Sequence, residues 1–329
     1  MSRFVLVGAG LHGCALGWEL ARRGADVVLV ERGVPGAEAS TAAAGILAPT
    51  VEAWAHGGAL LLGKQSLATY PTWVAAVSDA SGTRVDIHLT GVRVVGEKGP
   101  PGACEVDGDW IVEGEGWVDP KDLMPAVQGA AVAAGVRFVR GEVVEVRADR
   151  ARVDGVGWVD GTAVICAGAW TARVPGLASI PVRPVRGQVI ALRPRGLGPR
   201  TVVYGAGGYL VPRADGRVLV GATMEEVGFE RGVTPDGIAA MWRVARTLCP
   251  DLADAELLDA WSGFRPGTPD GLPLLGKYGD LWIASGHHRN GILLAPFTAM
   301  AMAAALLEGV ALPEELAPGR FEGGGIEAR

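Results

Sequence analysis

Residues 3–31 read RFVLVGAGLHGCALGWELARRGADVVLVE, and this stretch decides the fold class. Residues 4–7 form a short apolar run that ends at a glycine, which is typical of a buried strand. The spacing of apolar side chains predicts a helix over residues 11–23, and residues 25–31 form a second apolar strand. The chain therefore begins with a β-α-β unit, whose two strands we expect to be parallel.

The turn between the first strand and the helix has the pattern GxGxxG, formed by Gly8, Gly10 and Gly13. In nucleotide-binding turns the first glycine permits the tight turn, the second lets the backbone approach a pyrophosphate, and the third lets the helix pack close to the strand. Glu31 ends the second strand, where a carboxylate can accept hydrogen bonds from ribose hydroxyls. The pattern alone is weak evidence, but its place between strand and helix predicts dinucleotide binding.

Two segments of small residues favour FAD over NAD. Residues 40–45, STAAAG, follow the first unit closely and would let the backbone pass tightly against a flavin and its ribityl chain. Residues 165–170, ICAGAW, end a strand in a small-residue turn that suits a second backbone approach. Read in isolation, the first segment is also compatible with a flexible alanine-rich loop, and the second with an ordinary strand–loop junction.

Residues 286–292, GHHRNGI, precede the last predicted helix. Backbone N–H groups at such a helix start can face an anionic centre, and a reduced flavin carries negative charge at one edge of its ring. The adjacent His287 and His288 also raise the question of a metal ion. Neighbours in an extended segment point to opposite sides, so we expect no metal site.

Elsewhere the chain alternates between two patterns. A helix over 119–134 and strands over 136–146 and 158–167 can extend the parallel sheet. The remaining strand-like segments are separated by turns and suggest an antiparallel sheet; they cover residues 85–95, 182–192, 201–204 and 209–221, the last with a hairpin turn at 214–216.

The predicted fold is α/β, with a Rossmann-type FAD-binding domain interleaved with a mostly antiparallel β-sheet substrate domain. We assign residues 1–50, 115–178 and 260–329 to the FAD-binding domain, and residues 51–114 and 179–259 to the substrate domain. A helix is predicted over 235–248. The apolar stretch 291–307 contains Pro296 and many small residues, so a buried helix is expected there and no membrane span.

Composition narrows the classes of partner. The 329 residues carry a net charge of −6 and no basic run of the kind that follows nucleic-acid phosphates, so no nucleic-acid partner is expected. Four scattered cysteines without a CxxC pair, and no secretory signal before the first strand, predict reduced thiols and a cytoplasmic protein. The sequence leaves association into a homo-oligomer open.

Four blocks together resemble the D-amino-acid-oxidase-type flavoprotein family, and within it the glycine oxidases of thiamine biosynthesis. They are residues 8–13 (GAGLHG), 35–49 (PGAEASTAAAGILAP), 261–276 (WSGFRPGTPDGLPLLG) and 286–296 (GHHRNGILLAP). The resemblance implies an FAD cofactor. Covalent branches use a cysteine near the flavin, and none of the four cysteines falls in the last two blocks, so we expect non-covalent FAD. The family carries a longer helical stretch where this chain has only residues 95–114, which leaves the wall of the substrate domain in doubt.

The resemblance also implies site residues. Arg265 matches the arginine that binds the substrate carboxylate, a task that suits the planar guanidinium. Tyr209 matches a tyrosine that donates a second hydrogen bond to this carboxylate, and Met224 is expected to line the pocket near the substrate Cα. Arg289 is expected to bind the flavin or help to shape the pocket. The full set of cofactor-binding residues predicted from sequence is Gly8, Gly10, Leu11, His12, Gly13, Glu31, Arg32, Ser40, Thr41, Ala43, Gly45, Val144, Ala167, Gly168, Trp170, Arg289, Asn290, Gly291 and Ile292.

The function expected from these features is oxidation of the amine of glycine or another small amino acid, with dioxygen giving hydrogen peroxide. In the family the glycine imine also feeds thiazole assembly. One alternative is a sarcosine, proline or D-amino-acid dehydrogenase that uses another electron acceptor. Another is a flavin-binding module with weak catalysis that acts as the partner of a second protein.

Overall fold

The N-terminal strand lies inside a six-stranded sheet in the computed structural model, which describes residues 2–57, 59–96 and 98–322. Neighbouring strands are parallel except at one edge, where the last two strands form an antiparallel pair. In their order across the sheet the strands are β19 (Leu274–Tyr278), β20 (Leu281–Ser285), β13 (Thr162–Ile165), β1 (Arg3–Val7), β2 (Asp26–Glu31) and β9 (Arg137–Arg140).

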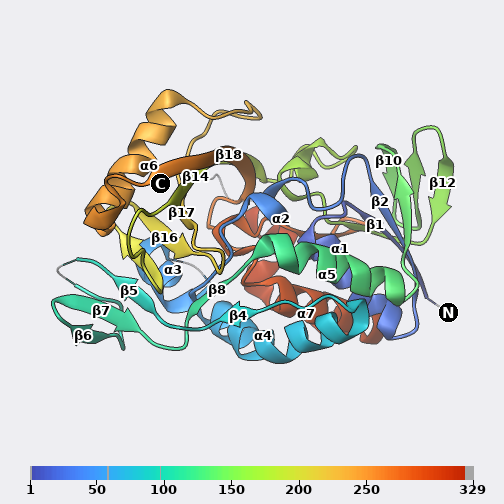
Figure 1. Cartoon of the computed structure of the whole chain (residues 1–329). Coiled ribbons are helices and arrows are strands. Elements are labelled where there is room, and N and C mark those ends of the chain that lie inside the picture. Colours follow the sequence, from blue (N-terminus) through green and yellow to red (C-terminus); the bar gives the residue numbers. More distant parts are fainter. Residues whose placement is uncertain (1, 58, 97, 323–329) are drawn as a thin grey trace.

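Side chains of successive residues in β1 point to opposite faces of this sheet, as the two-residue period of a strand requires. Phe4 and Leu6 pack against a layer of helices, whereas Val5 and Val7 pack toward a small antiparallel sheet on the other face. The helices are α1 (Leu11–Arg22), α4 (Leu60–Ser81), α5 (Pro120–Ala133) and α7 (Ala295–Glu308). The small sheet contains β10 (Val143–Arg147), β11 (Arg150–Val153) and β12 (Gly157–Asp160), at the right in Figure 1.

A second large sheet has eight strands and is antiparallel except for the pairing of β5 with β15 among the described strands. The predicted hairpin is confirmed, because β16 and β17 pair around the turn at 214–216. The order is β18 (Glu256–Gly267), β14 (Arg183–Arg193), β17 (Val218–Gly221), β16 (Gly208–Pro212), β15 (Val202–Gly205), β5 (Val92–Val94), β7 (Asp109–Val112) and β6 (Cys104–Val106).

The eight-stranded sheet is covered on both faces. Helix α6 (Pro235–Leu248) packs on one face, and α3 (Pro49–His56) contributes Val51 to the apolar cluster on the other (Figure 1). Three short strands link the two parts: β3 (Ile46–Leu47), β8 (Gly116–Val118) and β4 (Ile87–His88). The short helices are α2 (Ala39–Ala42), η1 (Gly168–Arg173), η2 (Pro250–Leu252), η3 (His288–Asn290), η4 (Glu314–Leu316) and η5 (Pro318–Phe321).

The α/β prediction is confirmed, but two strands were predicted too long. Residues 136–146 form β9 and β10, and residues 158–167 form β12 and β13; in each case the two strands belong to different sheets. The chain changes direction at Gly141 and at Gly161, the second of which has a positive φ of 142°. An apolar run shows that a segment is buried, but it does not show where the segment changes sheets.

The division into two domains stays a prediction, and two observations bear on its boundaries. Strand β18 runs unbroken through residue 260, so the predicted boundary there falls inside one strand of the eight-stranded sheet. Helix α4, predicted for the substrate domain, buries Tyr70, Trp73 and Val77 in the same core as α1, α5 and α7.

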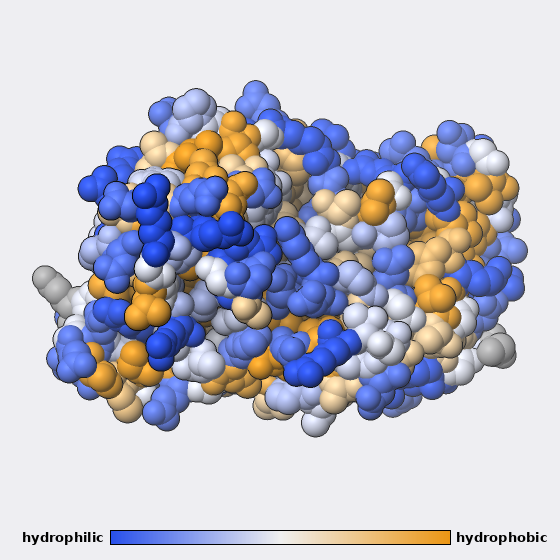
Figure 2. Space-filling view, viewed as in Figure 1, coloured by the Kyte–Doolittle hydropathy of each residue, from blue (hydrophilic) through white to orange (hydrophobic). Residues whose placement is uncertain are grey.

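Hydrophilic residues predominate on the face seen in Figure 2, and hydrophobic residues form separate patches. Helix α7 corresponds to the predicted buried helix, with Ala299, Met302 and Ala303 inside the core. Within the described part of the chain, every helix is too short or too polar to cross a membrane.

Candidate active site

A long cleft follows the carboxyl ends of β1, β13 and β20 and continues to the eight-stranded sheet. Ligands of open α/β sheets bind at this edge. One part of the cleft is lined by residues 10–12 of the GxGxxG loop, by most of residues 39–46 and by most of residues 284–292, and it extends to Arg265 and Tyr209. The other part is lined by Glu31, Arg32 and Trp170. The two parts share Gly10, Ser40 and Gly168, so they form one continuous site.

Two of the three glycines of the first turn leave no room for a side chain. Gly8 has a φ of 109°, and a Cβ at this position would lie 2.6 Å from the carbonyl oxygen of Cys166. A Cβ on Gly13 would lie 2.0 Å from the carbonyl oxygen of Gly8. Gly13 therefore allows α1 to pack against the turn, and it does not line the cleft itself. Gly10 does line the cleft, and its Cβ would meet the Ser40 hydroxyl at 3.2 Å.

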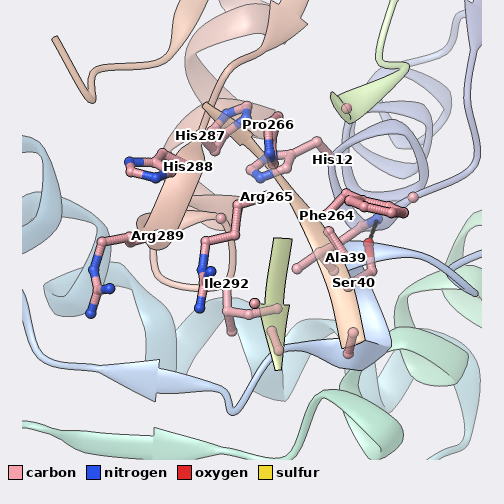
Figure 3. Close-up of a pocket in the computed structure, with 18 of the residues that line it drawn as sticks. His12, Ala39, Ser40, Phe264, Arg265, Pro266, His287, His288, Arg289 and Ile292 are labelled. Carbon is pink, nitrogen blue, oxygen red and sulfur yellow. Dashed lines mark hydrogen bonds between the residues drawn. The ribbon is translucent and has the colours of Figure 1, made fainter. Parts of the chain in front are cut away.

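Hydrogen bonds fix the polar groups near this turn. The backbone N–H of Leu11 donates to the Ser40 hydroxyl at 2.9 Å, which is the dashed contact in Figure 3. The Glu31 carboxylate accepts from the N–H of Ala9 at 2.9 Å and from the N–H of Gly33 at 2.8 Å. Glu31 is thereby held at the cleft with its acceptor oxygens preorganised for hydroxyl donors.

Arg32 and Trp170 close the outer end of the cleft, with the Arg32 guanidinium carbon 4.8 Å from the centre of the indole ring. Val143 lines this end, whereas the predicted Val144 does not. The pairing of β10 with β11 shifts between Val143 and Glu145, so Val144 sits in a β-bulge and its side chain is 42% exposed.

Most of the predicted cofactor residues lie together in this cleft. Those that line it are Gly8, Gly10, Leu11, His12, Glu31, Arg32, Ser40, Ala43, Gly45, Ala167, Gly168, Trp170, Arg289, Gly291 and Ile292. Thr41 does not line it, and its hydroxyl donates to the carbonyl of Gly36. Asn290 does not line it either; its backbone N–H donates to the carbonyl of His287, the residue before η3.

The cleft fits an extended dinucleotide. Bare glycine backbone faces it at Gly10, the N-terminus of α1 opens into it, and a fixed carboxylate stands at Glu31. A pyrophosphate suits the helix start, and ribose hydroxyls suit the carboxylate. The residues present therefore meet the requirements of FAD.

Arg265 lies at the inner end of the cleft on β18, with its side chain over the neighbouring strand β14. The guanidinium donates to the carbonyl of Thr223 at 3.1 Å, and Gly187 leaves the space that it fills. Burial lowers the pKa of Arg265, an effect that Tyr209 opposes and Arg289 reinforces. A half-buried cation with few neutralising neighbours is suited to bind an anion such as a carboxylate.

Arg289 belongs to a network that the sequence did not reveal. Its Nε and Nη2 donate to the two Glu52 carboxylate oxygens at 2.8 and 3.1 Å, and Nη2 also donates to the Tyr204 hydroxyl at 3.1 Å. The Tyr204 hydroxyl lies 2.5 Å from His56 Nε2. Burial acts to lower the pKa of Arg289, but Glu52 outweighs burial and raises it. The local sequence around each of the four residues carries no signal for this network, because they come from three separate segments.

Three histidines also line this region; His287 is buried, and His12 and His288 are half-buried. The rings of His12 and His287 stack with centroids 3.4 Å apart, and burial lowers the pKa of His12 to about 4. Burial, with Arg265 and Arg289, lowers the pKa of His288 to about 4. Figure 3 shows His288 close to the two arginines, which point the same way into the cleft. Burial also lowers the pKa of His287 well below its usual value, so the shifts favour the neutral form of all three imidazoles at pH 7.

Met224 is not in the main cleft. Its side chain is 51% exposed and lines a second cavity, which shares Tyr209 and Arg289 with the cleft. Arg265 and Tyr209 are thus brought together as predicted, and Met224 stands in the adjoining space.

Comparison with known proteins agrees with this site. The family model described as FAD dependent oxidoreductase matches residues 3–102 and 96–305. A glycine oxidase of Geobacillus kaustophilus is 34% identical over 357 aligned positions, covering 95% of this chain and 94% of that protein. The bifunctional protein ThiO/ThiG of Synechocystis is 35% identical, and the match covers 96% of this chain and 52% of that protein. The crystal structure of the Geobacillus enzyme superposes with a TM-score of 0.88 at 30% identity, covering 97% of this chain and 99% of the other. Matched over nearly its whole length and carrying the cleft that the cofactor requires, the chain belongs to the FAD-dependent oxidoreductases of the D-amino-acid-oxidase type.

Proposed function

We propose that this protein oxidises the amine of glycine, or of another small amino acid, to the imine, which water converts to the oxo-acid. The observation that carries the proposal is the half-buried Arg265 beside Tyr209 at the inner end of the cofactor cleft. Relatives matched over most of the chain are glycine oxidases, which supports the same substrate class.

The protein's own groups would bind and orient the substrate. The Arg265 guanidinium would hold the carboxylate in a fixed direction, and the Tyr209 hydroxyl would donate a further hydrogen bond. Burial and the nearby Arg265 and Arg289 lower the pKa of His288 and favour its neutral form. The imidazole therefore adds no positive charge that would repel a substrate ammonium. When bound, FAD supplies the two-electron acceptor for the hydride that leaves Cα.

The proposal also includes the electron acceptor, the use of the product and the cellular location. Dioxygen would take up the two electrons as hydrogen peroxide, and the imine would serve thiazole synthesis, as the name of the ThiO/ThiG relative suggests. Cys14, Cys104, Cys166 and Cys249 are all free thiols, which is typical of cytoplasmic proteins. A net charge of −6 argues against a nucleic-acid partner.

Anaerobic reduction of the bound flavin tests the proposal. The FAD-loaded protein is mixed with glycine, sarcosine, proline or D-alanine without oxygen, and the visible flavin absorbance is followed. Bleaching by glycine, followed by peroxide formation when air is admitted, is the expected result. Bleaching without peroxide would assign a dehydrogenase, and no bleaching by any of the four would overturn the proposal.

A further inference from the structure

Strand β14 carries two polar side chains on the face opposite Arg265. Arg186 and Gln188 flank Gly187, the residue that faces the Arg265 guanidinium, so their side chains point to the other side of the sheet. These two residues are only 5% and 1% exposed. Polar groups buried to this degree need hydrogen-bond partners, and the partner that both side chains share is Glu225.

The Glu225 carboxylate joins three side chains. Arg186 Nε donates to Oε2 at 3.0 Å, and Gln188 Nε2 donates to Oε1 at 2.7 Å. The Thr223 hydroxyl donates to the same Oε1. Burial acts to raise the pKa of Glu225, but the hydrogen bonds from these three side chains, that of Thr223 first, outweigh burial and lower it. The carboxylate is therefore ionised at pH 7, and Arg186 neutralises it.

Thr223 connects this carboxylate to Arg265. It follows the end of β17, outside the regular strands, and its N–H makes a long hydrogen bond of 3.3 Å to the carbonyl of Gln188. Its hydroxyl accepts from the Gln188 N–H at 2.8 Å and donates to Glu225. Its carbonyl accepts from Arg265 Nη1 at 3.1 Å. The bonds of the side chain therefore hold the carbonyl in one direction, and the carbonyl in turn orients the guanidinium.

The charges in this arrangement leave Arg265 available to a substrate. The group that orients Arg265 is an uncharged carbonyl, and the carboxylate behind that carbonyl is already paired with Arg186. Glu225 can thus act on the direction of the guanidinium without neutralising its charge. A carboxylate of the protein bound directly to Arg265 would instead compete with the carboxylate of the substrate.

We propose that Glu225 is a positioning residue for substrate binding: by holding the Thr223 hydroxyl it fixes the carbonyl that orients Arg265. The inference rests on the proposed amine oxidation, in which Arg265 binds the substrate carboxylate. A guanidinium makes two parallel hydrogen bonds to a carboxylate only when the two planar groups are aligned, so a change in the direction of Arg265 weakens the contact. Glu225 itself lines neither the cofactor cleft nor the adjoining cavity, so its effect on the substrate passes through Thr223.

Anaerobic reduction of the FAD-loaded protein by glycine tests the inference. Glu225→Gln offers one acceptor oxygen in place of two, so it cannot bond both Arg186 and Thr223. The apparent Kd for glycine should rise about 10-fold, the size of effect expected when a charge-assisted hydrogen bond is misaligned. The Kd for acetate, a carboxylate without an amine that is followed by its effect on the flavin absorbance, should rise by the same factor. The limiting rate of flavin reduction should change far less, and the FAD content should stay normal.

Two variants of Thr223 test the same link without removing a charge. Thr223→Val keeps the shape of the side chain but lacks the hydroxyl, and it should raise both Kd values about as much as Glu225→Gln. Thr223→Ser keeps the hydroxyl and should retain most of the affinity. This pair of variants decides the question if Glu225→Gln does not fold. Wild-type Kd values in Thr223→Val would overturn the inference.

Glu19→Gln is the matched control for the loss of a buried carboxylate. Glu19 is fully buried on α1, is bound by Arg22 and Arg23, and does not line the cleft. The variant should lower the free energy of unfolding but leave the Kd values for glycine and acetate unchanged. An equal rise of both Kd values in Glu19→Gln and Glu225→Gln would mean a general loss of structure and would overturn the inference.

A double variant shows whether Glu225 acts through Arg265. In the Arg265→Ala protein, Glu225→Gln should have no further effect on the Kd for glycine, because two residues that act as one unit are not additive. A further rise of about 10-fold in the double variant would overturn the inference while leaving amine oxidation intact. Failure of glycine, sarcosine, proline and D-alanine to reduce the wild-type flavin would instead overturn the proposed function.

Discussion

Gly187 of β14 lies directly against the guanidinium of Arg265 of β18: a Cβ built on Gly187 would lie 2.3 Å from Arg265 Nη1. The antiparallel register pairs Gly187 with Gly263. Arg265 follows Gly263 by two residues, so Gly187 and Arg265 lie on the same face of the sheet. The absence of a side chain at Gly187 therefore fixes where the arginine can lie.

Gly187→Ala is expected to displace Arg265 and lower kcat/KM for glycine by at least about 10-fold, since charge-assisted hydrogen bonds contribute about 1.5–3 kcal/mol. Steady-state kinetics on the FAD-loaded protein measure this effect. Gly196→Ala is the matched control, because a Cβ there meets nothing within 4 Å. Wild-type kinetics in Gly187→Ala would mean that Arg265 can move without loss of function.

Arg265→Ala should lower kcat/KM by at least about 10-fold, because the substrate carboxylate loses a bidentate partner in a buried site. Arg265→Lys should restore only part of the activity, since an ammonium cannot reproduce the planar fork. FAD content, measured by absorbance, should stay near normal. Loss of FAD from Arg265→Ala would indicate a structural role, and unchanged kinetics with every amino acid would exclude carboxylate binding.

Gly10→Val should abolish FAD binding. Its side chain would occupy the cleft at the place where the backbone must approach the pyrophosphate, beside the Ser40 hydroxyl. FAD is measured in the supernatant after acid precipitation, which releases a non-covalent cofactor from the wild-type protein. Circular dichroism checks that the variant is folded. Full FAD occupancy in folded Gly10→Val would contradict the role given to this turn, and flavin that stays in the wild-type precipitate would contradict non-covalent binding.

The ion pair of Glu52 and Arg289 should contribute strongly to stability, because the two side chains are only 9% and 11% exposed. Removal of one partner from a buried pair leaves an uncompensated charge and costs about 3–5 kcal/mol. Glu52→Ala and Arg289→Ala should each lower the free energy of unfolding by this order, and the double variant by less than the sum. Urea unfolding at a fixed FAD concentration measures the three values. Strict additivity would show that the pair is not coupled.

The stability should fall as the pH is lowered from about 6.5 to about 4. Burial lowers the pKa of His12, and burial together with two arginines lowers that of His288, in each case from 6.5 to about 4 in the folded chain. The unfolded chain therefore binds more protons in this window, so stability is lost as the pH falls, by up to about 1.4 kcal/mol per pH unit for each group. Unfolding free energies at pH 7, 6 and 5 measure the slope. His12→Asn should reduce this slope, and an identical slope in the variant would refute the assignment.

The sequence by itself determined the features that depend on neighbouring residues. The β-α-β unit, the glycine turn ending at Gly13 and the placement of Glu31 follow from short-range periodicity and from backbone freedom at glycine, so they could be read directly. The resemblance of the last two blocks also assigned Arg265, which the structure brings beside Tyr209.

Only the tertiary structure decided how distant segments meet. The bulge that turns Val143 rather than Val144 toward the cleft depends on the pairing of β10 with β11, and a shift of one residue exchanges the two faces of a strand. Gly187 faces Arg265 because of the β14–β18 register, and Glu52 meets Arg289 across 237 positions of sequence. Such contacts are set by strand register and by the packing of whole elements, and no local pattern around either residue encodes its partner.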